Sequence, residues 1–320
     1  MVLTPSDKPL ERGISIVVPV YNSESSLVEL AQRLEPVLRA QDKPFEAILV
    51  EDGSRDGSWK VVETLAEQFP WLRGIRMMRN YGQHNALLCG IRKARYDVIV
   101  TIDDDLQNPP EEIPQLLKKL EEGHDVVYGS PQKQQHGLWR DLASTVTKMA
   151  LQSAMGAESA RNVSAFRAFR TQVRDAFEAY RGPFPSIDVL LTWGTRRFSA
   201  LPVRHDPRKG GASNYTFFKL VNHALNMVTG FSTLPLQLTG VMGFCFTLFG
   251  IGILAFVMGR YFLEGTTVAG FPFLASIVAI FSGAQLFALG VIGEYLARMH
   301  FRMMERPTYT VRVCTHENRS

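Results

Sequence analysis

Two long segments without charged residues constrain the fold of this chain more than any other feature. Residues 220–259 contain no Asp, Glu, Lys or Arg over 40 positions, and residues 265–293 contain none over 29. About 20 consecutive apolar residues are enough to cross a bilayer as a helix. The mean hydropathy of the whole chain, -0.03, conceals both segments because the rest is charged. A wholly soluble protein is therefore the first class that the sequence argues against.

The two segments predict a helical hairpin in a membrane. The expected spans are residues 238–259 and 271–292, each about 33 Å long at about 1.5 Å per residue. Arginine is frequent after residue 294 but occurs only once in the connecting segment, at Arg260. The positive-inside rule therefore places both chain ends in the cytoplasm and the connection outside. A pair of buried core helices is the alternative.

Charge is distributed unevenly outside the hairpin. Residues 1–130 carry 15 Lys and Arg against 21 Asp and Glu, whereas residues 131–230 carry 14 against 6. The acidic part suits a bound cation, and the basic part beside membrane segments suits phosphate groups or anionic headgroups. Solvated surfaces of unequal sign are the alternative. The basic residues form no dense run and no aromatic-interleaved motif, so a nucleic-acid partner is not expected.

The cysteines and the N-terminus indicate that the region before the apolar segments lies in the cytoplasm. Cys89, Cys245 and Cys314 lie far apart without CxxC spacing, which indicates neither a disulfide framework nor a zinc site. A reducing compartment is therefore expected. The polar N-terminus and the short apolar run 14–20 lack the pattern of a signal peptide. The first 200 residues are expected to stay in the cytoplasm.

The region after residue 14 alternates short β-rich runs with stretches of helical period. The expected strands are 14–20, 46–52, 74–79 and 97–105, and the expected helices between them are 26–41, 58–69 and 85–94. This alternation predicts a parallel sheet covered on both faces, in an α/β nucleotide-binding domain. Such sheets bind ligands at the carboxyl ends of their strands. The polar residues at these ends are Tyr21, Asn22, Glu51, Asp52, Asp103, Asp104 and Asp105.

Three consecutive carboxylates, Asp103, Asp104 and Asp105, are the strongest local signal. Like charges at this spacing raise one another's pKa unless a cation neutralises them. Since strand side chains alternate, the first and third are expected on one side, where they could share one ion. Mg²⁺ or Mn²⁺ is the expected cofactor, because such ions take few protein ligands and complete their shell with phosphate oxygens. An acidic turn or helix cap is the alternative.

Two amphipathic stretches, residues 138–153 and 214–231, combine apolar helical periodicity with Lys, Arg or His on the other face. The second stretch leads directly into the first apolar segment. We therefore expect helices that lie along the membrane interface, in contact with lipid. Ordinary packing helices are the alternative.

Six segments in order carry a family resemblance. They are PVYNSE (19–24), LVEDGSRDGS (49–58), MRNYGQHNALLCGI (78–91), DDDLQNPPEEIP (103–114), RHDPRKGGASNY (204–215) and GVIGEYLARM (290–299). Together they resemble family 2 glycosyltransferases that act on polyprenyl phosphates. The resemblance implies a GT-A nucleotide-sugar-binding fold, a UDP-sugar donor and undecaprenyl phosphate as acceptor, in a multi-pass protein of the bacterial inner membrane. It also implies that a homotetramer can form.

The resemblance divides the chain into four parts. The expected parts are a cytoplasmic GT-A domain over 1–213, an interfacial helix over 214–234, the membrane hairpin over 235–293 and a cytoplasmic tail over 294–320.

Matching motif positions imply roles for individual residues. The donor-binding set is Pro19, Tyr21, Asn22, Glu24, Asp52, Gly53, Arg79, Asp103 and Asp104, in which Asp52 hydrogen-bonds the base. The metal set is Asp103, Asp105 and Gln107, and Asp103, Asp105 and Arg208 form the catalytic set, with Arg208 near the donor diphosphate. The acceptor-phosphate set is Arg140, Ser144, Arg167 and Ser213.

Several positions depart from the family pattern. Ser23 and Glu51 replace the usual Glu and Asp, Asp104 stands where Ala is common, and Pro131 stands where many relatives have Arg. The loop Gly211-Ala212-Ser213 departs from the commoner Gly-Glu-Ser. The role of Asp104 and the effect of Pro131 are therefore open.

The implied acceptor determines the expected chemistry. A polyprenyl phosphate is already an anion, so a single displacement with inversion at the sugar C1 needs no obligatory general base. The sugar itself is open between glucose, 4-deoxy-4-formamido-arabinose and others. A processive polysaccharide synthase is a rival function, but the chain lacks a Gln-x-x-Arg-Trp motif and further spans. A non-catalytic membrane scaffold that senses nucleotide sugars is the second rival.

Overall fold

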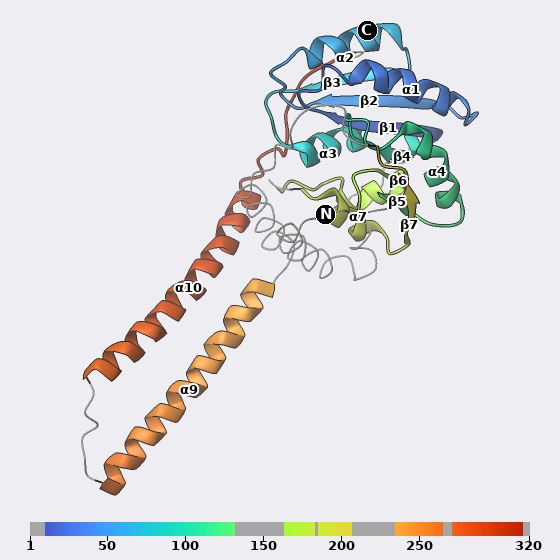
Figure 1. Ribbon diagram of the computed structural model, residues 1–320. Coiled ribbons are helices and arrows are strands. Elements are labelled where there is room, and N and C mark those ends of the chain that lie inside the picture. Colours follow the sequence, from blue (N-terminus) through green and yellow to red (C-terminus); the bar gives the residue numbers. More distant parts are fainter. Residues whose placement is uncertain (1–9, 132–162, 183–184, 207–233, 265–270, 316–320) are drawn as a thin grey trace. The chain divides into compact units, whose positions relative to one another are not determined.

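The structure is a computed structural model that describes residues 10–131, 163–182, 185–206, 234–264 and 271–315 (Figure 1). The chain divides into two compact units. The first unit is Met1–Val221 together with Glu305–Ser320, and the second is Asn222–Met304.

The first unit is built on an eight-stranded sheet with the order β7-β5-β6-β4-β1-β2-β3-β8. Its strands are β1 (Glu11–Val20), β2 (Phe45–Glu51), β3 (Leu72–Met77), β4 (Tyr96–Thr101), β5 (Val126–Pro131), β6 (Arg167–Arg170), β7 (Phe198–Val203) and β8 (Val311–Cys314). The four strands β4, β1, β2 and β3 are parallel neighbours, as the alternating pattern predicts. However, β6 runs antiparallel to both β4 and β5, and β8 antiparallel to β3. The sheet is therefore mixed rather than wholly parallel.

Helices cover both faces of this sheet. One apolar core lies under α1 (Leu27–Arg39), α2 (Ser58–Gln68) and α4 (Ile113–Glu121), and the other under α3 (Gln83–Lys93), α7 (Ile187–Gly194) and the 3-10 turn η2 (Thr171–Phe177). A second 3-10 turn, η1 (Pro110–Glu112), precedes α4. Strand β1 contributes side chains to both cores, because Val18 packs in the first and its neighbour Val17 packs in the second. The predicted burial of both faces of the sheet is confirmed.

The C-terminal strand β8 is the main element that the sequence did not predict. The whole of 294–320 was expected as a separate tail, but the last membrane-length helix continues to Met303 and the chain then returns to pair with β3. Ile75 pairs with Cys314 and Met77 with Val311. A four-residue strand carries too short an alternation to be recognised from sequence.

The second unit contains α9 (Leu234–Glu264) and α10 (Phe271–Met303). Within them, Pro235–Arg260 and Ile280–His300 are long and apolar enough to cross a membrane, and neither segment is buried inside the protein. This exposure argues against a pair of buried core helices. The first segment contains the predicted span 238–259, and the predicted span 271–292 lies within α10, which continues to Met303.

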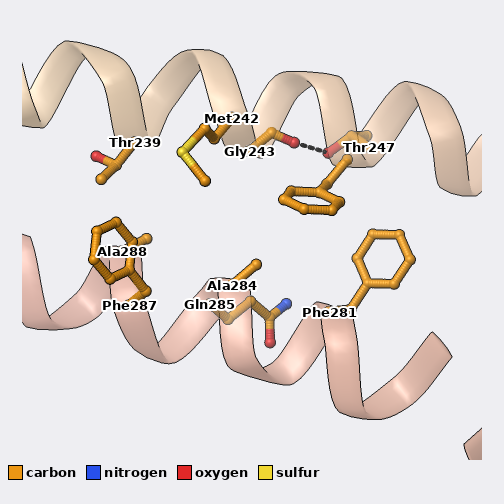
Figure 2. Close-up of a pocket in the computed structure, with 10 residues that line it drawn as sticks. Thr239, Met242, Gly243, Thr247, Phe281, Ala284, Gln285, Phe287 and Ala288 are labelled. Atoms are coloured by element: carbon orange, nitrogen blue, oxygen red, sulfur yellow. Dashed lines mark hydrogen bonds between the residues drawn. The ribbon is translucent and has the colours of Figure 1, made fainter. Parts of the chain in front are cut away.

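A pocket of about 250 Å³ lies between α9 and α10 (Figure 2). Small residues, among them Gly243 on α9 and Ala284 on α10, line it together with the amide side chain of Gln285. The rings of Phe246 and Phe281 meet edge to face with their centroids 5.6 Å apart. The two helices of the hairpin therefore contact each other without closing the space between them.

Candidate active site

The acidic motif lies in a turn at the carboxyl end of β4. The strand ends at Thr101, so Asp103, Asp104 and Asp105 follow it rather than belong to it. The expected alternation of side chains along a strand therefore does not apply to them. Leu106 completes the turn with a positive φ of 60° and a buried side chain.

Different elements hold the three carboxylates. The side-chain amide of Gln83, the first residue of α3, donates to Asp103 Oδ1 at 2.8 Å. The backbone N–H of Tyr21, just after β1, donates to Asp104 Oδ2 at 3.3 Å. The backbone N–H of Gln107 donates to Asp105 Oδ1 at 3.1 Å. The acidic turn is thus fixed between α3 and the end of β1.

The acidic turn brings three half-buried carboxylates together. Burial, followed by the charges of Asp105 and Asp104, raises the pKa of Asp103 to about 7. Burial also raises the pKa of Asp104 to about 6. Two carboxyls with raised pKa values side by side are a local electrostatic cost that a bound cation would relieve.

The donor chemistry of this turn fits a hard divalent cation. The available side-chain ligands are carboxylate and amide oxygens, which Mg²⁺ and Mn²⁺ prefer over nitrogen or sulfur. Among the described residues, no three His, Cys, Asp or Glu side chains form a metal site on their own.

Asp52 anchors a loop beside the acidic turn. It follows β2, is 2% exposed, and accepts hydrogen bonds from the backbone N–H groups of Tyr81 and Gly82, both at 2.7 Å. Burial raises the pKa of Asp52 to about 6, although these two hydrogen bonds oppose the shift. Gly53 has a φ of +69°, and a Cβ there would lie 2.5 Å from the backbone nitrogen of Asn80. Glycine is therefore required where the two loops meet.

The segment after β1 lies beside the acidic turn and the loop that follows Asp52. Asn22 Oδ1 accepts from the backbone N–H of Arg55 at 2.8 Å, and Glu24 Oε2 accepts from that of Gly57 at 2.9 Å. The ring of Tyr21 is 42% exposed and therefore open to a ligand.

Two further donor-set residues have contrasting surroundings. Pro19 is buried within β1, and its donor-binding role stays a prediction. Arg79 lies 4.2 Å from the ring centroid of Tyr81 and is close enough to Asp52 to favour its ionised form.

Arg167, a member of the expected acceptor-phosphate set, lies in a buried ion pair. Its side chain is 2% exposed and ion-paired with Asp188 at the start of α7, and its Nε donates to Thr101 Oγ1 at 3.1 Å. Among the described residues, the guanidinium is therefore engaged by Asp188 and Thr101. The resemblance placed the residue by motif and carried no information on burial, so its role in binding a phosphate stays a prediction.

The other acceptor-phosphate candidates, Arg140, Ser144 and Ser213, lie outside the described residues. The same holds for Arg208 and for the expected helices 138–153 and 214–231. Their roles stay predictions.

Two contributors to the site had no role assigned from sequence. Gln83 holds Asp103, and its signal was its place two residues before the predicted helix 85–94, within the quoted motif 78–91. The segment after β7 reaches the acidic turn, where the backbone N–H of Asp206 donates to Gln107 O at 2.8 Å. Next to it, His205 Nδ1 lies 3.4 Å from Asn108 Oδ1. His205 and Asp206 both belong to the motif 204–215, and this motif was the sequence signal for their part in the site.

Comparisons with known proteins agree with this geometry. Residues 15–178 match the model of glycosyl transferase family 2. The chain is 36% identical over 302 residues to the undecaprenyl-phosphate 4-deoxy-4-formamido-L-arabinose transferase of Pseudomonas syringae, covering 93% of this chain and 89% of that protein. It is 34% identical over 306 residues to the enzyme of the same name from Klebsiella pneumoniae, covering 95% and 94%.

Among solved structures, the fold is similar to glucosyl-3-phosphoglycerate synthase from Mycobacterium tuberculosis in complex with Mn²⁺, UDP and glucosyl-3-phosphoglycerate. The TM-score is 0.51 at 17% identity, over 68% of this chain and 78% of that one. The GT-A fold is thereby confirmed.

Proposed function

The chain belongs to glycosyltransferase family 2, and from this premise we propose that it transfers one sugar from a UDP-sugar to the phosphate of undecaprenyl phosphate. One observation carries the proposal: an acidic turn at the carboxyl edge of a GT-A sheet occurs in the same chain as two membrane-length helices. The names of the relatives support the acceptor and make 4-deoxy-4-formamido-L-arabinose the first sugar to test. Glucose is the second, because a solved neighbour holds UDP-glucose.

The donor site is proposed between the loops that follow β1, β2 and β3. Asp52 presents a carboxylate that can accept from the base while it holds Tyr81 and Gly82. Tyr21 offers an exposed ring nearby, and Asn22 and Glu24 fix the neighbouring loop. The UDP complexes of the solved neighbours support a nucleotide here.

Asp103, Asp105 and Gln107 are the proposed holders of Mg²⁺ or Mn²⁺. The Mn²⁺ in the neighbour complexes supports a divalent ion. Such an ion supplies positive charge for the departing nucleoside diphosphate. Gln83 keeps Asp103 oriented, and Tyr21 does the same for Asp104 through its backbone.

The proposed reaction is a single displacement. A phosphate oxygen of the acceptor forms a bond to the sugar C1 while the bond from C1 to the UDP oxygen breaks, so the anomeric configuration inverts. The acceptor carries its own negative charge, and no side chain has to remove a proton. The protein's contribution is to orient the two anions and to exclude water.

The hairpin α9–α10 brings the enzyme to its acceptor. Moving a polyprenyl chain into water costs about 0.8 kcal/mol per CH₂, so the reaction has to take place at the bilayer. We propose an inner-membrane protein with the catalytic unit in the cytoplasm, where the sugar nucleotide would be available.

A product assay tests this function against its rivals. Purified full-length protein is incubated with a radiolabelled UDP-sugar, Mn²⁺ or Mg²⁺, and undecaprenyl phosphate in detergent. The expected product is a lipid-linked monosaccharide. A polymer would support a processive synthase instead, and no turnover with any UDP-sugar would support a scaffold.

The pH dependence of base binding tests Asp52. The pKa of Asp52 is about 6, so its side chain is a charged carboxylate above pH 6 and a neutral carboxylic acid below. Only the charged form accepts hydrogen bonds from the base through both oxygens. Uridine affinity should therefore be full above pH 6 and fall up to tenfold per pH unit below it. Uridine without metal avoids titration of a diphosphate, and ligand-observed NMR from pH 5 to 8 reads the affinity. Asp52→Asn should flatten the profile; an unchanged pH dependence in that variant contradicts the assignment.

Arg140 is the positively charged residue among the acceptor-phosphate candidates that lie outside the described residues, Arg140, Ser144 and Ser213. Loss of one charge-assisted hydrogen bond costs about 1.5–3 kcal/mol, so Arg140→Ala should raise the KM for the lipid phosphate about tenfold or more. The donor KM should change less. Arg39→Ala, which removes a surface ion pair with Glu35 on α1, is the matched control. An acceptor KM equal to that of the control rejects the role.

A further inference from the structure

The segment Thr308–Thr315 returns from the hairpin and closes one edge of the catalytic sheet. Thr315 is bonded to Gly74 twice, since its backbone N–H donates to Gly74 O at 3.0 Å and its Oγ1 accepts from Gly74 N at 2.9 Å. At the other end, the backbone N–H of Met78 donates to Thr310 O at 2.9 Å. The returning segment is therefore hydrogen-bonded from Gly74 on β3 to Met78 just after it.

The attachment at Met78 is the beginning of a continuous strip. Residues 78–83 run from the end of β3 to the start of α3, and each part has a fixed partner. Met78 is held by Thr310, Asn80 lies against Gly53, and Tyr81 and Gly82 donate to Asp52. Gln83 then donates to Asp103. Six consecutive residues thus join the C-terminal segment to both the proposed base site and the acidic turn.

Side-chain packing strengthens the same attachment. Tyr309 packs against the core under α3, and its ring lies 5.8 Å from Arg92 Cζ. Burial raises the pKa of the Tyr309 hydroxyl, whose neighbours include Cys89 on α3. Thr308, just before it, is only 8% exposed. The C-terminal segment therefore holds both the strip and the helix that follows the strip.

We propose that Thr308–Thr315 is a positioning segment for the donor site, and that binding of the nucleotide depends on it while binding of the lipid acceptor does not. The proposal rests on the proposed function in taking Asp52 as the base-binding group. Its physical basis is that a hydrogen-bonding site loses affinity when its donors and acceptors must be ordered during binding. The strip 78–83 is ordered beforehand by the segment that follows the membrane helices.

A pair of truncations tests the proposal in the full membrane protein. A chain ending at Glu305 keeps both membrane helices and loses β8, whereas a chain ending at Thr315 keeps β8 and is the matched control. The shorter chain should bind UDP about tenfold or more weakly by calorimetry, and its donor KM should rise by a similar factor. Its acceptor KM should stay within about twofold. Equal UDP affinity in the two truncations overturns the proposal.

Tyr309 provides a milder test if the shorter chain does not fold. Tyr309→Ala removes the packing on the α3 core, and Tyr309→Phe keeps it. The donor KM should rise in the alanine variant, and the phenylalanine variant should restore it to near the wild-type value. A purely structural role would lower the amount of folded enzyme and leave both KM values unchanged. That outcome also overturns the proposal.

Hydrogen exchange separates this inference from the proposed function. In Tyr309→Ala, the amides of Met78, Tyr81 and Gly82 should exchange faster, whereas those of β4 should not. This readout needs no substrate, so it remains valid if the donor is not a UDP-sugar. Unchanged protection of the three amides would show that the returning segment does not order the strip.

Discussion

Asp105→Asn should lower turnover by about 10²–10³-fold at low Mg²⁺, the range observed when one group that stabilises transition-state charge is removed. The substitution keeps the size of the side chain but removes a charge from the acidic turn. Asparagine is a weaker ligand for a hard cation, so higher Mg²⁺ should recover part of the loss. Initial rates across a Mg²⁺ titration measure the effect.

The neighbouring carboxylate provides the control for this experiment. Asp104 accepts from the backbone of Tyr21 and is absent from the proposed metal set. Asp104→Asn should therefore lower turnover less than Asp105→Asn and should not shift the Mg²⁺ dependence. Wild-type turnover of Asp105→Asn at low Mg²⁺ would show that the metal assignment is wrong.

Arg167→Met should destabilise the catalytic unit by about 3–5 kcal/mol, because it leaves the carboxylate of Asp188 buried without its partner. Tyr128 Oη, which donates to Asp188 Oδ1 at 3.2 Å, cannot replace a positive charge. The double variant Arg167→Met, Asp188→Leu removes both charges and should recover much of the loss. Urea unfolding in detergent, followed by intrinsic fluorescence, gives the order of stabilities.

A second arginine on β6 shows what an exposed pair contributes. The Arg170 side chain is 38% exposed, and its Nε lies 3.7 Å from Asp125 Oδ1. Arg170→Met should cost at most about 1 kcal/mol. Equal stability of the two methionine variants would contradict the buried-pair account. A selective rise of the acceptor KM in Arg167→Met would instead support its role as a phosphate ligand.

Local patterns were sufficient for the parallel half of the sheet. The run Ile14–Val20 and the amphipathic helix after it form adjacent elements, so alternation and periodicity were enough to identify them. The antiparallel strands β6 and β8 pair with strands far away in the chain. The hydrogen bonds and contacts that stabilise such pairs cannot be recognised in the local sequence. Sequence could therefore predict the fold class but not the complete strand order.

The site shows the same division. Asp52 and Asp103 follow apolar strands and were found from that position alone. Gln83 and Tyr309 act through partners that only the folded chain brings near them. Arg167 illustrates what a motif leaves out: nothing in the sequence indicated that its side chain is buried and paired with Asp188.

The position of β8 at the end of the chain also sets the order in which the protein can be completed during synthesis. Gly74 and Thr315 bond across 241 positions, and both membrane-length helices are translated between them. Until β8 has been translated, β3 has an unpaired edge, which is a surface prone to pairing with other chains. Long-range pairing of this kind is slow to form. The ribosome must therefore deliver the hairpin before the catalytic sheet is closed, so an enzyme with a finished sheet has already made the helices that belong in the bilayer.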